Sequence, residues 1–496
     1  MKLVAPLAAG VPRVTIALMA FALLIVGLET LIAVPAAAIA KMELLDGAGA
    51  YAMGGALALT ALLLTLIVMS RLRGKLALWL SDPGQSRSTD LLLPLAVGLS
   101  LRLLVILSSS VSPTSDAGVF VTLGEMLASG KPYYFAHRWA YWPVGYPFLL
   151  SIWFRLLGSS LWTVQLLNLL LYATTTSAVG SVCARFGTRG AALIAMWILA
   201  LWPDLVVLSA WPSKELVAMT LLMSATALLV RSHAISFPRL GAAGALSGLL
   251  VLVQPSFLLL LPVLPALRLM SPGHSLARFA REWIIVLLAA AAIVLPWTYR
   301  NYTVLGEVVP VATNGGEVLY RANNPLARGD YMKRGEVDLW ELPELEANRI
   351  GMALAKQWIA ANPRAFLQLA VRKQLYFLED DGIGVYEVFQ RGRVGGAVSS
   401  RVYFLLKAAC NAFWWAMWLV VTSALILVAR HPGRTERLAF ILVGMPVVYL
   451  YGIHSVFESG PRYHQPADPF LALTAGLALT VAVACHRQAK TGNGLR

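Results

Sequence analysis

Charged residues are scarce in this sequence. Of its 496 residues only 13% are Asp, Glu, Lys or Arg, whereas 58% are hydrophobic. Soluble domains carry about 25% charged residues, so the shortage excludes a chain surrounded by water on all sides. We therefore predict a polytopic membrane protein, in which surface that faces lipid replaces the missing charge.

Cysteine is equally scarce. Cys183, Cys410 and Cys485 lie in apolar runs and form neither a CxxC pair nor a Cys/His cluster. This excludes a disulfide framework and a structural zinc site. The net charge of +15 comes without a basic stripe that contains aromatic residues, so we expect no nucleic-acid partner. We assign the charge to loops that fix the topology in the lipid bilayer.

Long apolar runs are abundant. Twelve stretches are candidates to cross the bilayer: 14–36, 49–70, 91–110, 161–183, 190–209, 215–231, 240–253, 256–270, 283–298, 403–429, 438–455 and 468–485. Gln254-Pro255 separates two short ones, and counting both places the Arg- and Lys-rich loops on one side. That side is the cytoplasm by the positive-inside rule. The predicted fold is an all-α protein of the cell inner membrane with about twelve spans and both termini in the cytoplasm.

This topology divides the chain into four parts. They are a two-span extension with a cytoplasmic loop (1–89), a seven-span module with a first periplasmic loop at 111–160 (90–298), a periplasmic domain of mixed structure (299–402), and a three-span module with a periplasmic loop at 456–467 (403–496). Helical spacing of apolar residues predicts helices outside the membrane at Gly118–Ser129, Leu345–Asn362 and Arg364–Leu378. Val144–Gly158 is apolar but too short to span, so we place it at the outer interface.

Polar residues gather at the outer ends of the predicted spans. Asp116 follows the third span, where it is either a helix N-cap or a catalytic carboxylate. Lys214 and Glu215 open the sixth span, where they serve helix-terminus electrostatics or a substrate. The last loop carries Arg462, Tyr463 and His464, as an interfacial anchor or a binding site.

Two further sets of ionisable residues have weaker interpretations. Arg102 and Asp204 fall within or near spans, and they either pair with each other or mark a functional path. The spacing of His454, Glu458 and His464 fits no compact metal motif.

The order of these motifs resembles a known family. SPTSDAGVFVTLGEMLASGKPY, YWPVGYPFLLSIWFRLLG, WPSKE, GALSGLLVLVQPSFLLLLP, LPWTYRNYTVLGEVVPVATNGGEVLYRANNP, WIAANPRAFLQLAVRKQLYF and SGPRYHQPADPFLAL follow one another along the chain. Together they resemble the C-type glycosyltransferases that use polyprenyl-phosphate sugars, such as protein O-mannosyltransferases and lipid A aminoarabinose transferases. The likeness covers about residues 90–485. Gln254 stands where the family has Arg, and Asp116 lacks the second acid that usually follows it.

The resemblance implies an inverting glycosyltransferase of cell-envelope glycan biosynthesis. Its donor would be an undecaprenyl-phosphate-like sugar, and its acceptor a glycan, lipid or protein on the periplasmic face. The leaving lipid phosphate is a stable anion, so the reaction needs a base and fixed cations but no general acid. We expect no cofactor and leave a divalent metal open. A ligase that uses a polyprenyl-diphosphate glycan, or a lipid or solute transporter, are the alternatives.

The resemblance also suggests residue roles. Asp116 would be the base. Arg462, Lys214, Arg300 and Lys373 are candidates to bind the donor phosphate, and Glu215 would orient Lys214 or sugar hydroxyls. The other predicted substrate-binding residues are Asn301, Tyr463 and His464.

Overall fold

The computed structural model describes residues 13–41, 47–81, 88–187, 189–231, 235–270, 275–330, 337–429 and 443–478. Within these ranges every regular element is a helix, which confirms the all-α prediction. Five of the described helices are long and apolar enough to cross a membrane, and four shorter ones are also apolar. By the length and composition of its helices, the chain is a multi-pass membrane protein.

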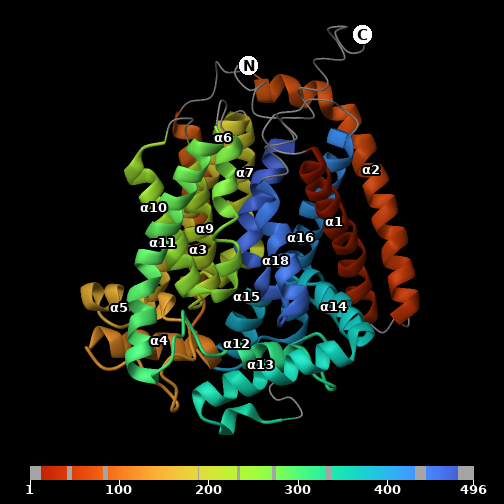
Figure 1. The fold of residues 1–496 in the computed structure, drawn as a ribbon. Coiled ribbons are helices and arrows are strands. Elements are labelled where there is room, and N and C mark those ends of the chain that lie inside the picture. The colour runs from red at the N-terminus through yellow and green to blue at the C-terminus, as the bar shows by residue number, and fades with distance from the viewer. Residues whose placement is uncertain are drawn as a thin grey trace.

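Long helices form a bundle, and shorter helices gather at its lower end (Figure 1). The bundle contains α1 (Arg13–Lys41), α2 (Gly47–Ser81), α3 (Leu92–Ser108), α6 (Leu161–Phe186), α7 (Arg189–Leu201), α9 (Lys214–Val230), α10 (Phe237–Val253), α11 (Leu276–Leu305), α16 (Ser400–Ala429) and α18 (Met445–Val456). Residues 468–478 are also helical. The elements at the lower end are α4 (Ser115–Ala128), α5 (Gly145–Leu157), α12 (Gly315–Ala322), α13 (Glu344–Ala361), α14 (Pro363–Leu378) and α15 (Ile383–Tyr386).

Helices α10 and α11 run parallel to each other. Gly244 packs against Val286, and Gly248 packs against Ala290, four residues farther along both helices. Two consecutive parallel helices require the chain between them to return to its starting end. Residues 255–270 make this return, which agrees with the prediction of two crossings between 240 and 270.

The returning segment is not the α-helix that a predicted span at 256–270 implies. It forms two short 3₁₀ helices, η3 (Pro255–Leu259) and η4 (Leu264–Met270). Pro255, Pro262 and Pro265 lack the backbone N–H that an α-helix needs. At its far end the buried Arg268 donates to the Leu229 carbonyl oxygen (2.7 Å) and pairs with Glu282 (2.9 Å), which joins α9 to the start of α11.

A second predicted span, 190–209, is interrupted. Helix α7 ends at Leu201, and a new short helix, α8 (Pro203–Leu208), begins after Trp202. Pro203 occupies the first turn of α8, the helical position where its missing N–H costs nothing. The total of twelve spans stays a prediction, because parts of the spans at 438–455 and 468–485 lie outside the described residues.

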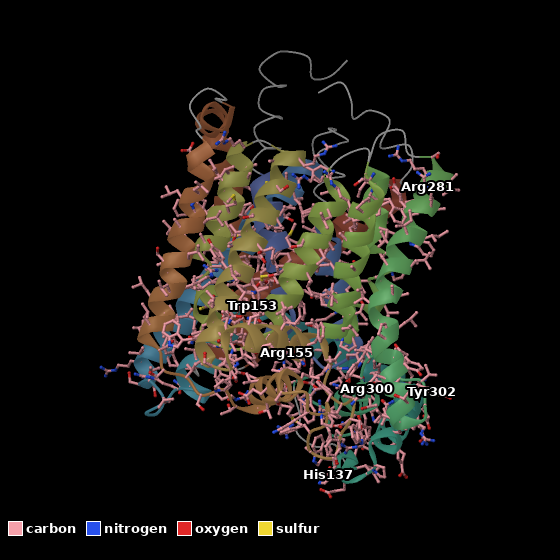
Figure 2. All side chains as sticks on the ribbon, turned by 90° about the vertical axis from the view of Figure 1, so that its left-hand side faces the viewer. His137, Trp153, Arg155, Arg281, Arg300 and Tyr302 are labelled. Atoms are coloured by element: carbon pink, nitrogen blue, oxygen red, sulfur yellow. The ribbon has the colours of Figure 1, made fainter. Side chains whose placement is uncertain are left out.

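Helix α11 runs from one end of the bundle to the other (Figures 1 and 2). Figure 2 shows Arg281 near the upper end of α11, with Arg300 and Tyr302 at its lower end. His137 also lies at the lower end (Figure 2). Helix α4, whose first turn carries Asp116, lies at the same lower end as Arg300 and opposite to Arg281 (Figures 1 and 2).

The segment 299–402 differs from the mixed domain that we predicted. Its described residues form helices without a strand, and an isolated bridge joins Arg393 to Val111. A small separate core of Leu319, Tyr320, Leu339, Ala347 and Ala355 holds α12 and α13 together. The helices predicted at Gly118–Ser129, Val144–Gly158, Leu345–Asn362 and Arg364–Leu378 are all confirmed as helices, with small shifts of their ends.

The N-terminal extension packs against the C-terminal helices. Trp415 on α16 donates to the Leu31 carbonyl oxygen of α1 (3.0 Å), and Tyr451 on α18 donates to Glu29. Helix α1 therefore joins the module that the sequence places at 403–496.

Candidate active site

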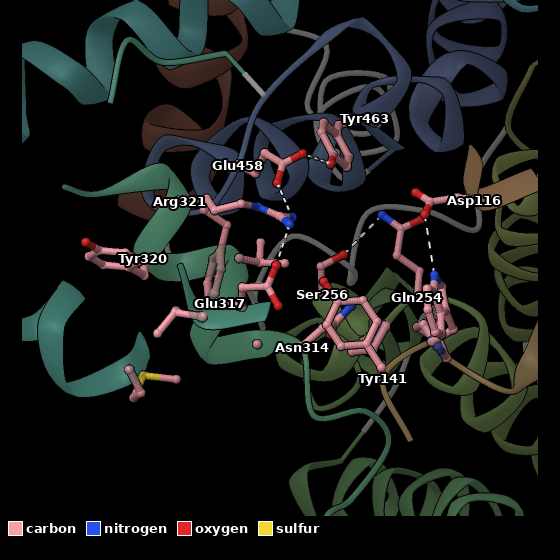
Figure 3. A pocket seen from close by; sticks show the side chains of 18 of the residues that line it. Asp116, Tyr141, Gln254, Ser256, Asn314, Glu317, Tyr320, Arg321, Glu458 and Tyr463 are labelled. Atoms are coloured by element: carbon pink, nitrogen blue, oxygen red, sulfur yellow. Dashed lines mark hydrogen bonds and ion pairs between the residues drawn. The ribbon is translucent and has the colours of Figure 1, made fainter. Parts of the chain in front are cut away.

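A cavity of about 650 Å³ opens at the lower end of the molecule. Its wall combines the first turns of α4 and α9, the 141–143 and 254–256 segments, α12, the 337–340 segment and the end of α18. Figure 3 shows Asp116 and Gln254 on one side of the cavity and Arg321, Glu317 and Glu458 on the other. The charged wall residues are Asp116, Glu317, Asp338, Glu458, Lys214, Arg321 and Arg462.

Asp116 lies in the first turn of α4. The preceding cap position, Thr114, makes no side-chain cap, and Ser115 has a left-handed φ of 54°. The Asp116 carboxylate instead accepts a hydrogen bond from Trp142 Nε1 (3.4 Å) and faces Arg462 Nη1 at 3.6 Å. Its side chain is 49% exposed. Asp116 is thus directed at the cavity and remains accessible to a substrate.

The charge of Asp116 is set by opposing influences. Partial burial acts to raise its pKa, but Arg462, Lys214 and the Trp142 hydrogen bond outweigh that effect and hold the pKa below its ordinary value. The carboxylate is therefore ionised at neutral pH, as a proton acceptor must be.

Arg462 comes from a 3₁₀ turn, Pro461–Tyr463, that follows α18. Its Nη2 donates to the Tyr463 hydroxyl (3.0 Å), and that hydroxyl donates to Glu458 (3.0 Å). Both Arg462 and Tyr463 line the cavity. The guanidinium is a planar donor of the kind that matches phosphate oxygens, and it lies between the acid at Asp116 and the acid at Glu458.

Lys214 and Glu215 are the first two residues of α9, and their side chains differ in the hollows that they line. Lys214 lines the main cavity, and its Nζ lies 5.8 Å from the centre of the Phe120 ring. Glu215 accepts a hydrogen bond from the Ser213 hydroxyl (3.0 Å). It lines a smaller adjoining cleft that Asp116, Lys214 and Arg462 also border.

Besides Glu215, four predicted substrate-binding residues lie outside the wall of the main cavity. Arg300 donates to the carbonyl oxygens of Trp139 (2.7 Å) and Tyr133 (2.8 Å). Asn301, fully buried, donates to the Val309 carbonyl oxygen (3.0 Å).

Lys373 and His464 are buried as well. Lys373 donates to Asn323 Oδ1 and to the Val456 carbonyl oxygen, both at 2.9 Å. Burial lowers the pKa of Lys373 to about 7. His464 lies 3.0 Å from Asp468. In this structure all four side chains hold the protein together rather than face the cavity.

The cavity also contains residues that the sequence analysis missed. Arg321 on α12 pairs with Glu317 (2.7 Å) and with Glu458 (2.9 Å), and so links α12 to the chain after α18. The sequence did carry one usable signal for the first pair, because opposite charges four residues apart pair on a helix. The contact with Glu458, 137 residues away in sequence, had none.

Aromatic rings form another part of the wall. Tyr141 and Trp142 lie edge-on to Trp340, with ring centres 5.3 and 6.2 Å apart. Tyr141 and Trp142 precede the proline of the YWPVGYP motif, whereas Trp340 belongs to a distant loop. Gln254, the departure from the family pattern, donates to Ser256 (3.1 Å) and lies in the wall near Asp116 (Figure 3).

Arg102 and Asp204 do not pair with each other. Arg102 donates to the carbonyl oxygens of Leu199 and Ala200 and stacks on the Tyr172 ring. Asp204 accepts from the Gly384 N–H (2.7 Å) and from Gln465 (2.8 Å). The prediction of a mutual pair is wrong, because each residue binds a different neighbouring segment.

Comparisons with known proteins give neighbours in structure alone. No family model and no curated protein matches the chain. The archaeal oligosaccharyltransferase AglB from Archaeoglobus fulgidus, in complex with an inhibitory peptide and a dolichol-phosphate, is similar at 13% identity and a TM-score of 0.46, over 82% of this chain and 52% of that one. ArnT from Cupriavidus metallidurans, bound to undecaprenyl phosphate, is similar at 14% identity and a TM-score of 0.41, over 82% and 79%.

The chain thus spans about half the length of the oligosaccharyltransferase. One neighbour is an oligosaccharyltransferase, and the other is bound to undecaprenyl phosphate.

Proposed function

We propose that this chain is a membrane glycosyltransferase that transfers a sugar from a polyprenyl-phosphate donor to an acceptor hydroxyl. The observation that carries the proposal is the meeting of Asp116, Lys214 and Arg462 at one cavity. One accessible carboxylate with two cations beside it is the set that this reaction needs: a proton acceptor and a binding site for a phosphate.

The proposed step is a single displacement. The acceptor oxygen attacks the anomeric carbon from the face opposite the phosphate and forms the new glycosidic bond. Asp116 takes the proton of the acceptor hydroxyl, and the bond from the anomeric carbon to the phosphate oxygen breaks with its electron pair. Arg462 and Lys214 bind the lipid phosphate as its negative charge grows, and the configuration at the anomeric carbon inverts.

The rest of the wall suits a sugar. Tyr141, Trp142 and Trp340 offer apolar ring surface, and Glu317, Arg321 and Glu458 offer fixed hydrogen-bonding groups across the cavity. A few placed polar groups in a mainly apolar pocket are typical of sites for small ligands. The Arg321 cluster links α12 to the chain after α18, so it can fix the orientation of a bound ring.

The orientation in the membrane decides how the donor and the acceptor reach the cavity. The lower end faces the periplasm, because the Arg- and Lys-rich loops predicted from the sequence lie at the opposite end. By the positive-inside rule that opposite end is the cytoplasmic side of the inner membrane. The lipid chain of the donor would then extend from the phosphate into the bilayer. The acceptor, a glycan, lipid or protein, would enter from the aqueous side.

The test uses purified full-length protein and a synthetic polyprenyl-phosphoryl sugar. We expect release of lipid phosphate only when an acceptor hydroxyl is present, with the new bond in the inverted configuration by NMR. Turnover of a polyprenyl-diphosphate glycan alone would instead indicate the ligase. Binding of the lipid without any bond cleavage, together with its movement across proteoliposomes, would indicate a transporter.

A further inference from the structure

Three buried side chains form a compact group behind the cavity wall. Asp381 lies in the loop after α14, and His464 and Asp468 follow Arg462 in the chain. They are 1%, 2% and 0% exposed. One ligand atom from each lies within 4.8 Å of the others. The two ring nitrogens of His464 face different partners. Nδ1 is 3.0 Å from Asp468 Oδ1, whereas Nε2 is 3.8 Å from Asp381 Oδ1 and 3.2 Å from the Asp380 carbonyl oxygen.

The protein leaves part of this group without hydrogen-bond partners. Asp381 Oδ2 accepts from Trp202 Nε1 (2.8 Å), but Asp381 Oδ1, which faces the histidine, accepts no hydrogen bond within the described residues. The same holds for Asp468 Oδ2. Buried carboxylate oxygens are costly unless a donor or a cation satisfies them. Asp381 Oδ1 therefore points to a ligand.

The charge balance points the same way. Asp204 is a third buried carboxylate close by, bound to Gln465, the residue that follows His464. Lys407 is the neighbouring ammonium, and it pairs with Asp380 rather than with the group. Within the described residues, no lysine or arginine forms an ion pair with Asp204, Asp381 or Asp468.

We propose that His464 Nε2, Asp381 and the Asp380 carbonyl oxygen bind a divalent cation, while Asp468 holds the ring in place through Nδ1. One imidazole nitrogen with carboxylate and carbonyl oxygens suits Zn²⁺ and Mn²⁺. Ligands at about 2.0–2.2 Å from a metal lie roughly 3.0–3.5 Å from each other, so the group must draw together slightly to close on the ion. This trio differs from the His454, Glu458 and His464 set considered from the sequence, since His454 Nδ1 lies against the Glu458 backbone oxygen.

The cation would have a positioning role for the proposed site. It would link the loop after α14 to the turn that carries Arg462 and Tyr463, which line the cavity. The His464 ring is already fixed, because it stacks on Trp414 with ring centres 4.3 Å apart. None of the three ligands lines the main cavity, so the ion would hold the wall in place without touching the substrate.

The test measures the metal directly. The full chain, purified in detergent with an affinity tag that contains no histidine, is stripped with a chelator, dialysed against Zn²⁺ or Mn²⁺ and desalted. We expect about one ion per chain by elemental analysis and a higher unfolding temperature than in the stripped protein. Asp381→Asn and His464→Gln should lose the ion, whereas the control His137→Gln, at an exposed ring, should keep it.

Two results would overturn the proposal. One is a wild-type metal content at the buffer background, which would leave the group as a protonated hydrogen-bond cluster. The other is full retention of the ion by folded Asp381→Asn and His464→Gln variants. If those variants do not fold, X-ray absorption of the Zn²⁺-loaded wild type decides: one imidazole with oxygen ligands supports the site, and a spectrum without imidazole refutes it.

Discussion

Asp116 can be a base or a structural residue, and one substitution separates the two. Asp116→Asn keeps the volume and the hydrogen bond to Trp142 but removes the proton acceptor. We expect turnover to fall by about 100-fold or more with an unchanged unfolding temperature, because the side chain is half exposed. Asp330→Asn, at an exposed acid away from the cavity wall, is the matched control. Normal sugar transfer by Asp116→Asn would remove Asp116 from the chemistry.

The cations around Asp116 predict a pH effect with a definite sign. Because Lys214 helps to lower the pKa of Asp116, Lys214→Gln should raise that pKa. A base with a raised pKa becomes protonated at a higher pH, so the acid limb of the kcat/KM profile should move to higher pH. In the wild type that limb should lie below the ordinary range of an aspartate. The exposed Lys131→Gln should leave the profile in place, and an unshifted limb in Lys214→Gln would contradict the assignment.

Arg462 tests geometry against charge. Arg462→Lys keeps the positive charge but loses the two parallel donors that match phosphate. Hydrogen bonds to charged groups are worth about 1.5–3 kcal/mol, so we expect transfer efficiency to fall roughly 10- to 100-fold per lost bond. The measurement is a donor titration at saturating acceptor, with the exposed Arg349→Lys as control. If Lys works nearly as well as Arg, then Arg462 anchors the turn and the phosphate binds elsewhere.

At the scale of elements, the parallel pair of α10 and α11 depends on glycine. A Cβ at Gly248 would lie 2.6 Å from the Ala290 carbonyl oxygen, whereas a Cβ at Gly241 in the same helix meets nothing within 4 Å. Small residues let membrane helices approach closely. Gly248→Ala should therefore destabilise the protein by about 1–3 kcal/mol, and Gly241→Ala should not, since Ala favours the helix.

The readout for both glycine variants is the unfolding transition in detergent. Equal stability of Gly248→Ala and Gly241→Ala would show that the backbones are farther apart than this structure places them. Because Gln254 in the cavity wall directly follows α10, we also expect Gly248→Ala to reduce sugar transfer more than Gly241→Ala does.

At the scale of the whole molecule, the proposal requires the cavity and the basic helix ends to face opposite compartments. Cys183, Cys410 and Cys485 are first replaced. Ser112→Cys and Ser129→Cys, both exposed at the lower end, should then react with an impermeant maleimide in intact spheroplasts. Ser236→Cys and Ser275→Cys, exposed before α10 and α11, should react only after the membrane is opened. Labelling of the second pair from outside would invert the topology.

The sequence by itself determined the class of the molecule and most of its helices. A hydrophobic run is a local property of the sequence. The ends of five predicted spans therefore agree within a few residues with those of the observed helices α1, α3, α6, α9 and α16. The helix that ends before Pro363 was predicted for a local reason, since proline limits the residue before it. The sequence also identifies Asp116, Lys214 and Arg462 as site candidates, because each follows or opens a span on the same predicted side of the membrane.

Tertiary structure decided what these residues touch. The pairing of Arg321 with Glu458 joins positions 137 residues apart, and no local pattern encodes such a contact. In the sequence analysis Arg300 and Lys373 were candidates to bind the donor phosphate. In the folded protein both side chains donate hydrogen bonds to backbone carbonyl oxygens instead. The group of Asp381, His464 and Asp468 likewise exists only because two distant loops meet in a buried region. Local periodicity fixes which face of a helix is apolar, whereas the partner of a polar side chain depends on the fold of the whole chain.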